Sequence, residues 1–260
     1  MPFSRGASIW QAMSATRHFQ MPDGRRIAFR HVRGTGPAVV FLPGYMSDMA
    51  GGKATALAQW AAARGRECLL LDYSGCGESS GLFDEGTLTR WCEETVALIE
   101  RQVNGRVVLV GSSMGGWLSL LAGRALAARL AGLVGIAAAP DFTDWGCSAS
   151  EQESLAAGKT VYEDNPYGPE PTPIHPGFWA DAQAQRLLGG TIALDCQVRL
   201  LHGQDDDVVP PEIALRLARA LRSEDVQVTL VKGGDHRLSR ESDIALLLRT
   251  VAALTEGTAP

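Results

Sequence analysis

Residues 111–115, with the sequence GSSMG, fit the pattern G-x-S-x-G and place Ser113 at its centre. The apolar run 107–110 comes directly before this pattern, and a segment with helical character follows it. A serine in this setting lies on a sharp turn between a strand and a helix, with its hydroxyl exposed. The neighbouring glycines leave room for the strained turn. The sequence therefore predicts that Ser113 is a nucleophile for acyl transfer.

The general base is predicted to be a histidine near the end of the chain. A serine hydroxyl is a weak nucleophile at neutral pH unless a base removes its proton. Where this nucleophile turn occurs, the acid and then the histidine follow the serine in the chain. Only His236 follows the last predicted strand, in the glycine-rich loop GGDH. The other histidines lie before the serine, within a central insertion or at the end of a strand: His18, His31, His175 and His202.

The acid that supports the histidine is predicted to lie among three consecutive aspartates. Asp205, Asp206 and Asp207 follow the segment VRLLHGQ, in the loop after a predicted strand. The acid must reach the far nitrogen of the imidazole to hold its tautomer and stabilise the imidazolium. Spacing alone does not choose among the three, and Asp141, after the preceding strand, is a further candidate.

An oxyanion hole and an acyl pocket complete the predicted site. The backbone N–H of Met114 is the expected first donor to the oxyanion, and the loop after an early strand supplies the second. That loop contains Gly44, which lets the backbone approach closely, so the N–H of Tyr45 is the predicted second donor. Apolar side chains predicted to line the acyl pocket are Met46, Trp117, Trp145, Phe178 and Trp179.

The elements that must position these residues alternate between short apolar runs and helix-like segments. This alternation predicts a mostly parallel sheet with helices on both faces. The predicted strands are residues 25–31, 38–42, 68–72, 107–110, 133–137, 198–202 and 226–231. Apolar residues three or four positions apart predict helices within residues 88–103, 213–221 and 244–251. Ser239 is predicted to cap the last of these helices.

Residues 141–195 interrupt this rhythm, because no strand pattern appears in them. Prolines crowd the middle of the segment, and aromatic residues flank them. An insertion of this length in a compact domain is functional or disordered, and its aromatic content favours a folded cap over the site. We therefore predict a hydrolase core made of residues 15–140 and 196–255, with residues 141–195 as a cap or lid.

Composition excludes several classes of function. The net charge is −5 and no Lys/Arg cluster is present, which argues against a nucleic-acid partner. The five cysteines are scattered without a CxxC pair, so neither a zinc site nor a disulfide framework is expected. Residues 72–79, DYSGCGES, lack the last glycine of a nucleotide-binding loop, and no cofactor is predicted. No apolar run is long enough for a membrane span, and the first twenty residues lack a secretory signal.

Five segments resemble one family in particular: FLPGYMSDMAGGKA, LDYSGCGESSG, LVGSSMGGWLSL, RLLHGQDDDVVP and GGDHRLS. Together they are similar to the family of alpha/beta hydrolase domain-containing protein ten, over about residues 20–252. The resemblance implies the α/β-hydrolase fold. It also selects Asp206 as the acid, because the family's acid stands four places after the histidine of an HG pair. Ser113 and His236 match the family's nucleophile and base.

The resemblance implies a serine esterase or thioesterase that acts on acylated proteins or on small-molecule esters such as acyl glucuronides. Three alternatives stay open: the same residues acting on lactones, the same residues acting on carbon–carbon bonds, and a non-catalytic binding protein with this fold. The family is mitochondrial, and Arg5 and Arg17 precede the first acidic residue, Asp23. The N-terminal segment is short for an import signal, so we expect a bacterial, cytoplasmic relative, with the mitochondrial matrix as the alternative. The sequence gives no prediction of oligomeric state.

Overall fold

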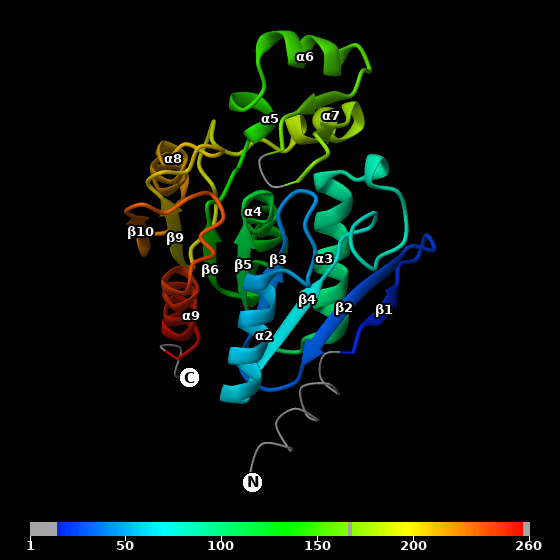
Figure 1. Ribbon diagram of the computed structural model, residues 1–260. Helices are drawn as coiled ribbons and strands as arrows, with labels where there is room; N and C mark the ends of the chain where they lie inside the picture. The colour runs from blue at the N-terminus through cyan, green and yellow to red at the C-terminus, as the bar shows by residue number, and fades with distance from the viewer. Residues whose placement is uncertain (1–14, 166–167, 257–260) are drawn as a thin grey trace.

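A central eight-stranded sheet organises the protein (Figure 1). The computed structural model describes residues 15–165 and 168–256; Arg5, part of the import-like pattern, lies outside them. Antiparallel pairs join β2 to β1 and β4, and all other neighbouring strands are parallel, which confirms the predicted mostly parallel sheet. The spatial order is β1 (Arg17–Gln20), β2 (Arg26–Val32), β4 (Arg66–Leu71), β3 (Thr35–Leu42), β5 (Val107–Ser112), β6 (Leu130–Ile136), β9 (Gln197–Gly203) and β10 (Val226–Val231).

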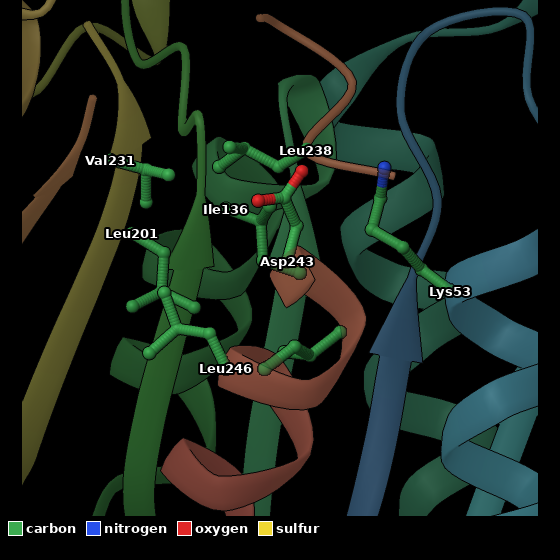
Figure 2. A pocket seen from close by; sticks show the side chains of 8 residues that line it. Lys53, Ile136, Leu201, Val231, Leu238, Asp243 and Leu246 are labelled. Atoms are coloured by element: carbon green, nitrogen blue, oxygen red, sulfur yellow. The ribbon is translucent and has the colours of Figure 1, made fainter. Parts of the chain in front are cut away.

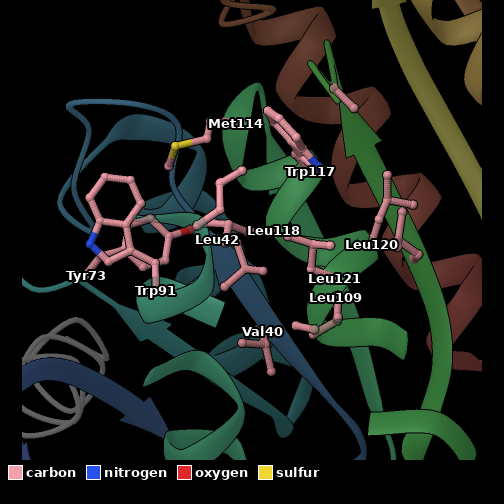
Figure 3. Packing of buried hydrophobic residues seen from close by; sticks show 14 of the residues in the cluster. Val40, Leu42, Tyr73, Trp91, Leu109, Met114, Trp117, Leu118, Leu120 and Leu121 are labelled. Atoms are coloured by element: carbon pink, nitrogen blue, oxygen red, sulfur yellow. The ribbon is translucent and has the colours of Figure 1, made fainter. Parts of the chain in front are cut away.

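Helices cover both faces of the sheet. Successive strand residues point to opposite sides, so a strand of apolar residues presents an apolar surface to each helix layer. In β3, Val39 and Phe41 face the cluster formed with α2 (Gly52–Arg64) and α9 (Glu241–Glu256). Val40 and Leu42 face the cluster formed with α3 (Leu88–Gln102), α4 (Met114–Leu126) and α8 (Glu212–Ala220). Figure 3 shows this second cluster, where α4 residues pack on strand residues and on Trp91 of α3. These strands are apolar on both sides, as expected of a parallel sheet between helix layers.

The helix ends follow local hydrogen-bonding rules, with one difference from the prediction. The side chain of Thr87 accepts a hydrogen bond from the N–H of Arg90 and so caps α3. The predicted cap of α9 is wrong, because the Ser239 hydroxyl donates to the carbonyl of Arg237 instead. The Asp243 carboxylate accepts from the backbone N–H of Arg240 at the start of this helix.

The segment between β6 and β9 folds as a separate layer over the carboxyl ends of the parallel strands (Figure 1). It contains α5 (Phe142–Trp145), α6 (Ala149–Ala156) and α7 (Pro176–Ala184). It also contains an antiparallel pair, β7 (Val161–Glu163) and β8 (Thr172–Ile174), which no strand pattern in the sequence indicated. These strands are three residues long, too short to show an alternating pattern. In residues 15–165 and 168–256, no helix has the length and apolar character needed to cross a bilayer.

Candidate active site

Ser113 occupies the turn between β5 and α4, with φ 55° and ψ −120°. Two glycines make this turn sterically feasible. A Cβ at Gly111 would lie 2.1 Å from the carbonyl oxygen of Gly115, and one at Gly115 would lie 2.0 Å from that of Leu42. The backbone N–H of Ser113 donates to the Ile136 carbonyl, 2.9 Å away. The turn is therefore held in a strained conformation, with the positive end of the α4 dipole behind the hydroxyl.

His236 reaches Ser113 from the loop between β10 and α9. Its Nε2 lies 3.1 Å from the Ser113 hydroxyl oxygen, across 123 residues of sequence. The loop is anchored next to the histidine by the side chain of Leu238, which is buried and has a positive φ. Lys53 of α2 donates from its ammonium group to the carbonyl of Arg237. Figure 2 shows Leu238 and Lys53 on the two sides of Asp243, around a small cavity beneath the loop.

Of the three consecutive aspartates, Asp206 is the one that contacts His236. Its Oδ2 lies 3.0 Å from Nδ1 of the imidazole. Its Oδ1 accepts the backbone N–H groups of Val208 and Val209 at 3.0 and 2.8 Å, which fixes the orientation of the carboxylate. Asp205 and Asp207 are exposed.

The alternative acid, Asp141, binds backbone N–H groups of the inserted segment. Its two carboxylate oxygens accept the backbone N–H groups of Leu187 and Leu188, each at 2.8 Å. Burial raises the pKa of this carboxyl group, and the two N–H donors oppose that effect. Asp141 thus joins the beginning of the inserted segment to its end.

The electrostatics of Asp206 suit the support of a positive imidazolium. Burial alone would raise the pKa of Asp206, but the ring nitrogens of His202 and His236 that face the carboxylate outweigh this effect and hold the pKa well below its usual range. The carboxylate is thus ionised and accepts a hydrogen bond from Nδ1 of His236, which carries the imidazole proton. Nε2 of His236 then carries a free lone pair, which faces the hydroxyl of Ser113.

The loop after β3 lies against the nucleophile, as the oxyanion prediction requires. A Cβ at Gly44 would lie 3.3 Å from the carbonyl oxygen of Ser112 and 3.4 Å from Cβ of Ser113, so the two loops are within van der Waals distance of each other. The backbone N–H of Met49, further along this loop, donates to the buried carboxylate of Asp72 at 2.7 Å. Within the described residues, the N–H groups of Tyr45 and Met114 have no acceptor. Two unpaired donors beside a serine are a suitable arrangement for an oxyanion.

The residues predicted to line the acyl pocket divide into two groups. Trp117 and Phe178 are buried and pack in the main core cluster. For these two, contact with an acyl chain would require the inserted segment to move. Met46 is 51% exposed, and Trp145 and Trp179 are partly buried. The lining role of all five stays a prediction.

Aromatic side chains attach the inserted segment to the core. The Trp117 indole N–H donates to the carbonyl of Gln185, and the Tyr45 hydroxyl donates to that of Pro173 at 2.9 Å. The Tyr45 ring also packs on the rings of Phe142 and Phe178, with centroids 5.9 and 4.9 Å away. The segment therefore rests on the loop that carries the predicted oxyanion donor.

Three residues near the site were not predicted from the sequence. His202 lies against Asp206, Lys53 holds the His236 loop and Asp72 holds the loop after β3. For His202 a signal was present, because it stands four residues before Asp206 in the HG pair. Lys53 and Asp72 lie in segments quoted for the family resemblance, but their contacts join distant parts of the chain, and the sequence did not indicate these contacts.

Comparison with known proteins agrees with this fold. The model of the alpha/beta hydrolase family matches residues 39–247. The chain belongs to this family. The solved structure of Est1E from Butyrivibrio proteoclasticus with bound ferulic acid has the same fold, with a TM-score of 0.70 at 17% identity.

Within that family, the relatives include the proteins called palmitoyl-protein thioesterase ABHD10, mitochondrial. The human protein is 35% identical over 239 residues, which are 90% of this chain and 78% of the human one. The structure of mouse alpha/beta hydrolase domain-containing protein 10 superimposes with a TM-score of 0.88 at 32% identity, over 94% of this chain and 100% of the mouse chain. A putative hydrolase from Agrobacterium vitis S4 gives 0.87 at 37% identity, over 93% and 98%. The predicted fold and family resemblance are confirmed. The mitochondrial relatives are consistent with the matrix alternative for location.

Proposed function

We propose that this protein is a serine hydrolase that cleaves esters or thioesters through an acyl-enzyme on Ser113. The observation that carries the proposal is the continuous contact from Ser113 through His236 to Asp206, at 3.1 and 3.0 Å. His236 takes the hydroxyl proton as the serine oxygen attacks the acyl carbonyl, and the N–H groups of Tyr45 and Met114 receive the oxyanion. His236 then gives its proton to the leaving group, which departs as a thiol or an alcohol.

The second half of the reaction repeats these steps with water. His236 removes a proton from a water molecule, the resulting hydroxide attacks the acyl-enzyme, and the serine leaves with the proton returned by His236. Asp206 stays ionised throughout and stabilises the imidazolium in both halves. The net reaction consumes one water and releases a carboxylic acid.

The proposed substrates are acylated proteins and small-molecule acyl esters, including acyl glucuronides. Support comes from the relatives, whose name is palmitoyl-protein thioesterase. Of the predicted lining residues, Met46, Trp145 and Trp179 are exposed or partly buried and supply apolar surface that suits an acyl chain. A thiolate is a better leaving group than an alkoxide, and the proton that His236 donates assists the departure of either, so the same residues can serve both ester classes.

The test is a burst experiment with a p-nitrophenyl acyl ester. We expect a burst of one nitrophenolate per active site, followed by slower turnover, and neither in Ser113→Ala. Ser112→Ala is the matched control, since it makes the same change one residue away and should keep the burst. Equal activity of Ser113→Ala and the wild type would overturn the proposal.

The alternatives are separated by probes of different chemistry. A fluorophosphonate should label the wild type at Ser113, while a non-catalytic binding protein would stay unlabelled. A panel of thioesters, esters and lactones of equal chain length separates acyl hydrolysis from lactone cleavage. The highest kcat/KM is expected for the thioesters, and faster turnover of lactones would favour the alternative.

A further inference from the structure

His202 lies in contact with the acid of the proposed triad, although no step of the reaction above uses it. It is the penultimate residue of β9 and only 1% exposed. Its Nε2 is 2.9 Å from the carbonyl oxygen of Val209 and 3.2 Å from Oδ2 of Asp206. Oδ2 is the same oxygen that faces Nδ1 of His236.

The neighbours of the imidazole determine where its proton sits. Both atoms close to Nε2 are acceptors, a carbonyl oxygen and a carboxylate oxygen, so Nε2 carries hydrogen. That N–H donates to Val209, and the backbone N–H of Val209 in turn donates to Oδ1 of Asp206. His202 therefore closes a ring of contacts around the Asp206 turn and places a donor beside Oδ2.

The acidic residues near Asp206 in the chain have other surroundings. Asp205 and Asp207, on the same turn, are exposed. On the loop after β10, the Asp235 carboxylate accepts the backbone N–H of Leu238. In the described part of the chain, the basic side chains with a nitrogen within 4 Å of the Asp206 carboxylate oxygens are His202 and His236.

We propose that His202 is a positioning residue for Asp206, which holds the carboxylate in line with His236 and weakens its attraction for the His236 proton. The inference rests on the proposed function of Ser113, His236 and Asp206. A second donor beside Oδ2 neutralises part of its charge, so less charge acts on the imidazolium. Without His202, the carboxylate moves more freely and holds the proton of His236 more strongly.

The test compares three substitutions of His202 with different donors. His202→Gln places an amide N–H close to the position of Nε2, whereas His202→Asn is too short to reach Oδ2, and His202→Leu has no donor. For the Asn and Leu variants we expect kcat per labelled serine to fall about tenfold, the loss typical of one hydrogen bond to a charged group. We also expect the acidic limb of the kcat/KM profile to move to higher pH, by about half a unit. The Gln variant should stay close to the wild type in both measurements.

His31→Gln is the matched control for loss of a buried histidine. His31 is buried on β2 and pairs with Glu67, in contact with none of the proposed triad, so activity should not change. Active-site counting with a fluorophosphonate separates unfolded protein from impaired protein. If His202→Leu does not fold, the Asn and Gln pair makes the same comparison.

Two outcomes would overturn the role of His202. One is a wild-type kcat per labelled site and an unmoved acidic limb in the Asn and Leu variants. The other comes from proton NMR of the resting protein. We expect the resonance of the His236 Nδ1 proton to move downfield in the Asn and Leu variants, but not in His202→Gln or His31→Gln. An unchanged resonance in the Asn and Leu variants would contradict the proposal. If the wild type hydrolyses no ester or thioester, the proposed function fails, and the resonance still decides the part played by His202.

Discussion

Replacing Asp206 with asparagine should nearly abolish turnover while leaving the fold in place. Oδ1 of Asp206 accepts two backbone N–H groups, from Val208 and Val209. In the Asp206→Asn variant the amide oxygen would have to take this position, since an amide NH₂ there would face two donors. The NH₂ group would then occupy the place of Oδ2, facing His236 at 3.0 Å and His202 at 3.2 Å.

The magnitude follows from the tautomer that this orientation imposes. An NH₂ donor at Nδ1 of His236 moves the imidazole proton to Nε2, where it points at the Ser113 hydroxyl. The histidine then has no lone pair with which to accept the hydroxyl proton. In serine proteases the equivalent change lowers kcat by about 10⁴, or about 5 kcal/mol of transition-state free energy. The NH₂ group also faces the His202 N–H, and this contact should cost about 1–2 kcal/mol of stability.

The assay is steady-state hydrolysis of a p-nitrophenyl ester, with folding followed by circular dichroism and urea unfolding. Asp205→Asn and Asp207→Asn are matched controls, because they make the same change at exposed neighbours and should keep kcat within about twofold. Asp141→Asn should lower stability and leave the pH profile unchanged. A folded Asp206→Asn protein with kcat within tenfold of the wild type would refute the reasoning.

Two further predictions concern groups that lie farther from the serine. Burial lowers the pKa of His31 below its usual 6.5, so the unfolded chain binds a proton more readily than the folded one as pH falls. The free energy of unfolding should therefore decline as the pH falls below about 6.5. Urea unfolding between pH 5 and 8 should show a smaller decline in His31→Gln than in the wild type. Equal slopes of the free energy of unfolding against pH in the two proteins would contradict this. Lys53→Met removes the ammonium donor to Arg237 and loosens the His236 loop. We expect kcat to fall two- to tenfold, roughly the value of one hydrogen bond, with Lys53→Arg nearer the wild type; an unchanged kcat in the Met variant contradicts this role.

The nucleophile turn and the alternation of strands and helices were predictable because short-range rules control them. The G-x-S-x-G pattern places glycines where Ser113 and α4 need room, and this requirement is visible in five residues. The predicted strands match seven of the eight strands of the main sheet. The eighth, β1, is four residues long and mostly exposed.

Features set by long-range contacts could not be derived in the same way. Spacing left three adjacent aspartates open, because the choice depends on which carboxylate the turn after β9 directs inward. The backbone N–H groups of Val208 and Val209 make that choice by fixing Asp206. The family resemblance reached the same residue from a motif. The strand order and the burial of Trp117 and Phe178 depend on the packing of the whole chain, which no local pattern encodes.

The double attachment of Tyr45 ties substrate entry to the chemistry that follows. Its hydroxyl donates to the carbonyl of Pro173 in the inserted segment, while its backbone N–H is the proposed second donor to the oxyanion. A chain that pushes residue 173 outward must either break this hydrogen bond or pull on the backbone that carries the donor. A long acyl group can thus change the rate of the chemical step as well as the affinity of the substrate. The length of the acyl chain should therefore affect kcat as well as KM.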